Sequence, residues 1–264
     1  MPYRIDIRDP GDHVLDRLVA LGALDVEMVS PGRMAALVPD RVTREQLTRE
    51  LGIDDIAVSP ATGRDNGSVW VLTPWPVRVG SLRIVPAHLE AWPGDLRLLD
   101  SPAFGTGLHA TTALCLEAIE ERVTIAPPDA VLDVGTGSGV LALAALTLGV
   151  RCALAIDVDD QALRTATDNA RLNELDSRLN VAHGGPETVT GTWPLVLANI
   201  LAAPLIEMAP SLVRRVGHLG ELVLSGIPRS AEREVTQAYV HLGMRRIHVR
   251  SRAGWMALTL RASW

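Results

Sequence analysis

The 264-residue sequence contains only two cysteines, Cys115 and Cys152, which lie far apart in apolar surroundings. Isolated cysteines of this kind predict small core side chains in a reducing compartment, and they argue against a disulfide framework or a metal site. Long apolar runs are missing as well, since stretches such as Val140–Leu146 are too short to span a bilayer. The N-terminus carries charges where a signal peptide needs an apolar stretch. We therefore expect a soluble, cytoplasmic protein that does not enter a membrane and holds no metal.

Basic charge is outweighed by acidic charge, and lysine is missing altogether. All 25 basic residues are arginine, and the formal net charge is −6. This balance argues against a protein that is held to nucleic acid mainly by neutralising phosphates, and it permits a basic protein partner. Apolar residues make up 47% of the chain and charged residues 21%, which is the balance of a globular protein with a sizeable core.

The first 58 residues alternate strand and helix signals in the order strand, helix, strand, strand, helix, strand. The predicted strands are Tyr3–Ile7, Asp25–Val29, Met34–Val38 and Asp55–Val58, and the helices are Asp12–Leu21 and Thr43–Leu51. This order is that of a small α+β ferredoxin-like unit, and nothing in it looks catalytic. Residues 59–98 are richer in Pro and Gly and predict a linker with some structure of its own. Its tryptophans, Trp70, Trp75 and Trp92, are expected to pack the linker onto a domain.

From residue 99 to residue 264 the pattern changes to short apolar strands that alternate with helices. The predicted strands are Ala130–Val134, Ala153–Val158, Asn180–His183, Leu195–Asn199, Glu221–Ser225, Arg245–Arg250 and Trp255–Leu260. The predicted helices are Thr111–Glu121, Val140–Leu148, Gln161–Asn173, Pro204–Val213 and Ser230–Leu242. Near-continuous apolar strands between helices indicate a parallel sheet buried on both faces, hence a doubly wound, Rossmann-like α/β domain. The last two strands suit a terminal hairpin.

A glycine-rich turn, Asp133–Gly139, connects the strand Ala130–Val134 to the next helix. Glycines allow a ligand to approach the backbone closely, and the helix N-terminus behind them presents unpaired N–H groups. The GxGxG spacing departs from the GxGxxG of nicotinamide enzymes and favours S-adenosylmethionine. The candidate cofactor contacts in this turn are Asp133, Gly135, Thr136 and Gly137.

Asp157 ends the next strand, about 20 residues after the turn, where a carboxylate can accept both hydroxyls of a ribose. The alternative is a cap for the following helix, but Asp159 and Asp160 are better placed for that. Val158 is a further candidate contact beside Asp157. His183–Gly185 follows the third strand, and this loop either lies along the edge of a bound adenine or forms a simple turn.

Two further candidate elements are Asn199, at the end of the fourth core strand, and the glycine loop Phe104–Thr112. A lone Asn at a strand end is usually a turn former, but here it lies where an acceptor nitrogen would be oriented. The loop opens a helix whose N-terminus suits a carboxylate, and its candidate contacts are Thr106, Gly107, His109 and Thr112. Thr111 and Thr112 can instead cap that helix, and a lone His such as His109 is more often structural.

Taken together, these elements resemble the ribosomal protein L11 methyltransferase (PrmA) family. The matching strings are AFGTGLHATT, VLDVGTGSGVLALAA, AIDVDDQAL followed by Asn169 and Asn173, LANILA, LSGI and WMALTLR. The resemblance implies a class I methyltransferase domain behind a ferredoxin-like substrate-recognition domain, with methyl transfer to lysine and N-terminal amino groups of ribosomal protein L11. It also implies cofactor contacts at Thr112, Gly135, Asp157 and Asn199. The chain departs from the family before Phe104, where Leu98–Ala103 replaces the usual Asp-Pro-Gly-Met-Ala stretch.

The expected mechanism is in-line methyl transfer to a neutral amine that is held near Asn199, with no obligatory general base. Three alternatives stay open: methylation of another protein or a small molecule, a nicotinamide oxidoreductase, and a module that binds the cofactor without transfer. The lack of lysine fits the general bias toward Arg, Ala, Leu, Val and Gly better than selection against self-methylation.

Overall fold

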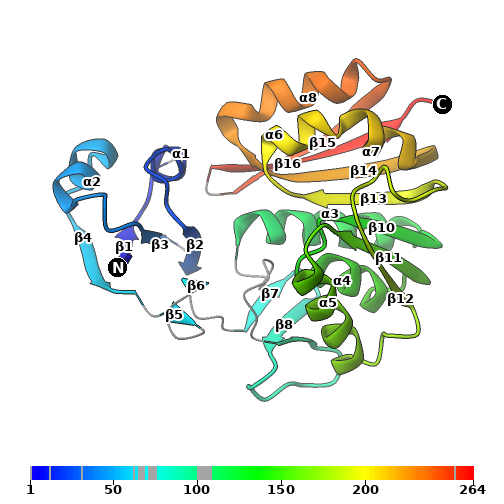
Figure 1. Ribbon diagram of the computed structural model, residues 1–264, viewed down its shortest axis with the longest axis horizontal. Coiled ribbons are helices and arrows are strands. Elements are labelled where there is room, and N and C mark those ends of the chain that lie inside the picture. Colours follow the sequence, from blue (N-terminus) through cyan, green and yellow to red (C-terminus); the bar gives the residue numbers. More distant parts are fainter. Residues whose placement is uncertain are drawn as a thin grey trace.

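The computed structural model describes residues 2–11, 13–30, 32–61, 63–64, 69–70, 76–99, 109–252 and 254–264. Its two largest sheets occupy opposite ends of the chain (Figure 1). Among the described residues, no helix is long and apolar enough to cross a membrane.

A four-stranded antiparallel sheet with two helices forms the N-terminal unit. Its elements are β1 (Tyr3–Arg8), α1 (Val14–Ala20), β2 (Asp25–Ser30), β3 (Arg33–Val38), α2 (Arg44–Leu51) and β4 (Ile56–Pro60). The strands lie in the order β2-β3-β1-β4, which confirms the predicted element order. Helix α2 begins with a capping box in which the Thr43 side chain accepts from the Gln46 amide and the Gln46 side chain accepts from the Thr43 amide. The cap fixes where α2 starts, as the sequence predicts.

Residues 77–98 form a second, smaller sheet with strands β7 (Val77–Val79), β8 (Leu82–Pro86) and β9 (Leu96–Leu98). A two-stranded ladder of β5 (Gly63–Arg64) and β6 (Val69–Trp70) precedes it. The buried side chains of β7, β8 and β9 belong to the same apolar cluster as those of the C-terminal unit. The expected packing role of Trp92 is wrong, because this side chain is 62% exposed and lies against the Arg83 guanidinium. The side chains of Trp70 and Trp75 lie outside the described part of the chain.

The C-terminal unit is a seven-stranded sheet in the order β12-β11-β10-β13-β14-β16-β15. Its strands are β10 (Ala130–Val134), β11 (Cys152–Asp157), β12 (Leu179–His183), β13 (Trp193–Asn199), β14 (Val216–Pro228), β15 (Met244–Arg252) and β16 (Trp255–Ala262). The first five strands in that order are parallel, and β16 pairs antiparallel with both of its neighbours, β14 and β15. This arrangement confirms the predicted parallel α/β core with a terminal hairpin.

Helices cover both faces of the seven-stranded sheet (Figure 1). Those on one face are α3 (Ala110–Ile125), α4 (Val140–Thr147) and α5 (Asp160–Leu172), and those on the other are α6 (Ala202–Glu207), α7 (Ala209–Arg215) and α8 (Glu232–Val240). The single helix predicted over 204–213 is two helices, α6 and α7, that meet at Met208. The reason is Pro210, which has no N–H to donate and whose ring would clash with the carbonyl of Ile206 in a continuous helix.

The two cysteines differ in their surroundings. Cys115 on α3 is fully buried, and this burial raises the pKa of its thiol to about 12. Cys152 at the start of β11 is only partly buried, so the prediction of a core side chain is correct for Cys115 alone.

Apolar side chains connect the N-terminal unit to the C-terminal sheet. Ala110 and Leu114 of α3 and Trp255 and Ala257 of β16 belong to the buried cluster that fills the N-terminal unit. This contact brings the N-terminal unit to the edge where the predicted site residues lie.

Candidate cofactor and active site

A pocket of about 770 Å³ opens at the carboxyl ends of β10, β11, β12 and β13. This edge of an open parallel sheet is where ligands bind, and the volume lies within the range of small-molecule sites. The N-terminal unit contributes a wall to it through apolar residues, which are Val19, Ala23, Leu24 and Val26. Other lining residues, which were not among the predicted individual contacts, are Thr111, Ala162, Ile200, Leu201, Pro204, Met208, Gly226 and Trp255.

The glycine turn forms the floor of this pocket. The amides of Gly135 and Thr136 both donate to the Ile156 carbonyl oxygen, at 2.9 and 3.1 Å, so the turn is fixed to β11. Gly135 has φ +70°, and a Cβ there would lie 2.5 Å from Ile200 Cγ2. A larger residue would therefore be strained and would also push into the segment that follows β13.

Asp133 lies beneath the turn with 1% of its surface exposed. The Thr136 hydroxyl donates to its Oδ2 at 2.6 Å, but burial still raises the pKa of Asp133 to about 6. Asp133 and Thr136 are therefore packed behind the pocket wall and support the turn from below.

Asp157 ends β11 and faces the same pocket. Its Oδ2 accepts from the Gly137 amide at 2.9 Å, and its Oδ1 accepts from the Asp159 amide at 3.0 Å. Asp159 is the cap of α5, since its side chain accepts from the Gln161 amide at 2.8 Å. The carboxylate of Asp157 thus aligns the turn, and each of its oxygens keeps a lone pair for a further donor.

Asn199 and the segment after it form the opposite wall. Within the described residues, Asn199 Oδ1 is buried and has no hydrogen-bond partner. Thr112 Oγ1 and Asp133 Oδ1 are likewise buried and have no hydrogen-bond partner among the described residues. Asn199 is the one of these three that lines the pocket, and because buried polar atoms are nearly always paired in folded proteins, its oxygen suits a donor supplied by a ligand there.

His109 is the cap of helix α3, which corrects the expectation that Thr111 or Thr112 caps it. Its Nδ1 accepts from the Thr111 amide at 3.3 Å and lies 2.7 Å from the Thr111 hydroxyl. Burial lowers the pKa of His109 to about 4, so the ring is neutral near pH 7. The ring also packs edge-on against Trp255, with centroids 5.1 Å apart. His109 is thus both a helix cap and a lining residue of the pocket.

Asn169 of α5 and Asn173, the C-cap of that helix, hold strand β9 and the residue after it, and Asn169 also bonds the glycine turn. Asn169 Nδ2 donates to the Ser138 carbonyl at 2.8 Å, and its Oδ1 accepts from the Leu99 amide at 2.7 Å. Asn173 Oδ1 accepts from the Arg97 amide, and its Nδ2 donates to the Arg97 carbonyl, at 2.8 and 2.7 Å. Their four-residue spacing puts both on one helix face, but the sequence does not show what that face meets.

The predicted site residues fall into three groups. Those that line the pocket are His109, Gly135, Gly137, Asp157, Val158 and Asn199. Thr112, Asp133 and Thr136 are buried but are not among the pocket-lining residues. Thr106 and Gly107 lie outside the described residues. Gly184 and Gly185 also line the pocket, while His183 turns away to lie 3.0 Å from the Val158 carbonyl oxygen.

Comparison with known proteins points to one family. Residues 44–263 match the family described as Ribosomal protein L11 methyltransferase (PrmA). A Ribosomal protein L11 methyltransferase from Pelobacter propionicus is 40% identical over 219 residues, which are 80% of this chain and 71% of the relative. One from Symbiobacterium thermophilum is 38% identical over 235 residues, which are 82% of this chain and 76% of the relative. The crystal structure of ribosomal protein L11 methylase from Lactobacillus delbrueckii subsp. bulgaricus has a TM-score of 0.65 and 31% identity, and covers 71% of this chain and 99% of that one.

Proposed function

Since the chain belongs to the ribosomal protein L11 methyltransferase (PrmA) family, we propose that it methylates lysine and N-terminal amino groups of ribosomal protein L11. The methyl donor in this proposal is S-adenosylmethionine, bound in the pocket between the glycine turn and Asn199. The observation that carries the proposal is the meeting of Gly135, Asp157 and Asn199, far apart in the sequence, around one pocket.

The residues present fit this cofactor. Gly135 and Gly137 line the pocket with backbone alone, next to the N-terminus of helix α4. Asp157 supplies a carboxylate that can accept ribose hydroxyls, and the buried Asn199 Oδ1, which is unpaired among the described residues, lies at the opposite wall. When bound, S-adenosylmethionine supplies a methyl group that its sulfonium already activates.

The residues of the protein have to bind the acceptor amine in its uncharged form and orient it toward the methyl group. The wall that the N-terminal unit adds is apolar, with Val19, Leu24 and Val26, and such surroundings lower the pKa of a lysine that enters them. Asn199 Oδ1 can then accept a hydrogen bond from the neutral amine and orient its lone pair. His109, with its pKa near 4, is a poor proton acceptor at pH 7. The proposal therefore makes Asn199 a positioning group, and the amine loses its proton to water.

The test is incubation of the chain with radiolabelled S-adenosylmethionine and the purified proteins of the large ribosomal subunit, followed by separation of the labelled products. Label on L11 supports the proposal, and label on another protein would assign a different substrate. If no protein were labelled, the chain would instead be a module that binds the cofactor without transferring its methyl group.

The role of Asn199 is tested by Asn199→Ala in the same assay. We expect methyl transfer to fall by at least tenfold while the affinity for S-adenosylmethionine, measured by calorimetry, stays within a few-fold. Asn180→Ala is the matched control, because Asn180 is an exposed asparagine on β12 outside the pocket. If methyl transfer by Asn199→Ala were unchanged, Asn199 would not be the residue that positions the amine.

A further inference from the structure

A second cavity, of about 590 Å³, lies at the opposite edge of the seven-stranded sheet. Glu221 lines it near the start of the paired part of β14, whereas Gly226, five residues on, lines the cofactor pocket. Five residues of strand span about 17 Å, so a ligand in this cavity could not touch the reacting atoms. The basic lining residues are Arg122, Arg245 and Arg261, and Glu221 is the acidic one among the described lining residues.

Three of these charged side chains form a row across neighbouring strands. Arg261 on β16 lies directly opposite Arg245 on β15 and opposite Glu221 on β14. Side chains that face each other across antiparallel strands lie on the same side of the sheet. The next residue, Arg246, points to the other face and pairs there with Glu232 of α8, at 2.7 Å. Arg245 is therefore directed to the face that α3 covers.

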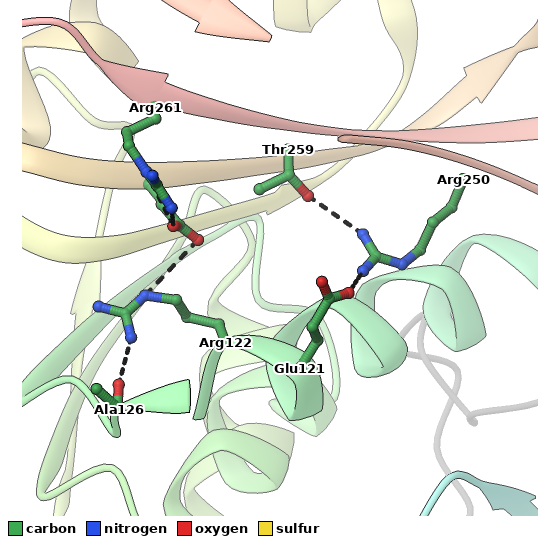
Figure 2. Close-up of polar contacts among 7 residues, drawn as sticks. Glu121, Arg122, Ala126, Arg250, Thr259 and Arg261 are labelled. Atoms are coloured by element: carbon green, nitrogen blue, oxygen red, sulfur yellow. Dashed lines mark hydrogen bonds and ion pairs between the residues drawn. The ribbon is translucent and has the colours of Figure 1, made fainter. Parts of the chain in front are cut away.

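Together with Arg122 of α3, the row has one carboxylate for three guanidinium groups. Glu221 Oε1 accepts from Arg261 at 2.6 Å, and its Oε2 lies 3.6 Å from Arg122 Nε. Figure 2 shows Arg122 reaching up from α3 and Arg261 reaching down from the sheet, with Arg122 also donating to the Ala126 carbonyl. Glu221 is 6% exposed, and its two carboxylate oxygens already face Arg261 and Arg122. No oxygen of Glu221 is therefore left to pair with Arg245.

Arg245 has no ion pair or hydrogen bond to any described side chain, yet it faces Arg261. Like charges directly opposite each other in a sheet are unfavourable, and this pair has no second carboxylate to separate it. An anion bound between the two guanidinium groups would stabilise this arrangement. Guanidinium groups bind phosphate and carboxylate groups with pairs of N–H donors. The exposed apolar side chains of Ile125 and Leu219 line the same cavity and suit a ligand with an apolar part next to its charge.

We infer that this cavity is a binding site for an oxyanion, a phosphate or carboxylate group that bears an apolar tail and bridges Arg245 and Arg261. The inference does not depend on the proposed methyl transfer, because it uses a different edge of the sheet and different residues.

The test measures thermal unfolding of the full chain against butyl phosphate and against hexanoate, with sodium chloride added to hold ionic strength constant. We expect at least one of the two probes to raise the unfolding temperature saturably. Response to butyl phosphate alone assigns a phosphoryl ligand, and response to hexanoate alone assigns a carboxylate. Response to neither probe overturns the inference.

The variant is Arg245→Gln, and the matched control is Arg233→Gln, which removes an exposed arginine of α8 outside this cavity. Arg245→Gln should weaken the probe's apparent affinity at least tenfold, and Arg233→Gln should leave it unchanged. Without a probe, Arg245→Gln should unfold at the wild-type temperature or above it, because it removes a like-charge pair. An equal response of both variants, or a less stable Arg245→Gln without a probe, would overturn the inference. Affinity for S-adenosylmethionine serves as the check that the variant is folded.

Discussion

Replacing Gly226 by alanine should damage both stability and the cofactor pocket. Gly226 lies in β14 where the register with β16 shifts, and its φ is +83°. A Cβ at this position would lie 2.1 Å from the carbonyl oxygen of Ile200 and 2.7 Å from its carbonyl carbon. The obstacle is backbone, which cannot rotate aside as a long side chain can. The segment Asn199–Leu201 would therefore have to move.

The expected loss has two parts. Holding alanine at a left-handed φ costs about 1–2 kcal/mol, and forcing a packed backbone apart costs about 1–3 kcal/mol more. The sum is about 2–5 kcal/mol, which lowers the unfolding temperature by roughly 4–20 °C at the usual 2–4 °C per kcal/mol for a chain of this size. Because Ile200 and Leu201 line the cofactor pocket and Ile200 lies against Gly135 of the glycine turn, affinity for S-adenosylmethionine should fall at least tenfold.

The assay is thermal and urea unfolding followed by circular dichroism, with calorimetric titration of the cofactor. Gly94→Ala is the matched control, since Gly94 has φ +91° and no atom within 4 Å of the site of its Cβ. That variant carries the conformational cost alone, about 1–2 kcal/mol. If Gly226→Ala proved no less stable than Gly94→Ala, the collision with Ile200 would not exist in solution and the reasoning would fail.

Two further predictions concern buried polar groups. Asp133→Asn should change the pH dependence of stability. The pKa of Asp133 is about 6 in the folded chain against about 4 unfolded, so this carboxyl contributes up to about 3 kcal/mol below pH 4 and loses that contribution as pH rises through about 6. Urea unfolding from pH 4 to 7 should show this decline in the wild type and a flatter profile in the variant, and parallel profiles would contradict the raised pKa. Asn169→Ala removes the buried hydrogen bonds that Asn169 makes to the Ser138 carbonyl and the Leu99 amide, which should cost about 2–5 kcal/mol in urea unfolding. Asn180→Ala is the exposed control, and a loss below about 1 kcal/mol in Asn169→Ala would show that the bridge to β9 does not contribute.

Local patterns predicted the main elements and much of the site. The alternation of apolar strands with helices identified the parallel sheet, and glycine spacing located the turn at Gly135. Asp157 and Asn199 could be placed because the carboxyl ends of parallel strands meet at one edge. Pro210 divides α6 from α7, because a proline at this position is incompatible with one continuous helix over 204–213.

Features that depend on contacts between distant segments could not be predicted. The lining residues Val19 and Leu24 follow from how the N-terminal unit packs on α3 and β16, which no local pattern encodes. Asn169 meets Leu99 across 70 residues of sequence. His109 caps α3 although hydroxyl and carboxamide side chains are preferred at such positions, so propensity pointed to Thr111 or Thr112 instead.

The position of β16 has a consequence for how the chain folds as it is synthesised. The strand Trp255–Ala262 is inserted between β14 and β15, and its Trp255 also belongs to the cluster of the N-terminal unit. Domains fold as they leave the ribosome, N-terminal parts first. Here β16 can complete the seven-stranded sheet, and Trp255 can join the N-terminal cluster, only after these residues have emerged. Until then the edge of β14 that β16 covers is unpaired, and an unpaired edge can pair with other chains.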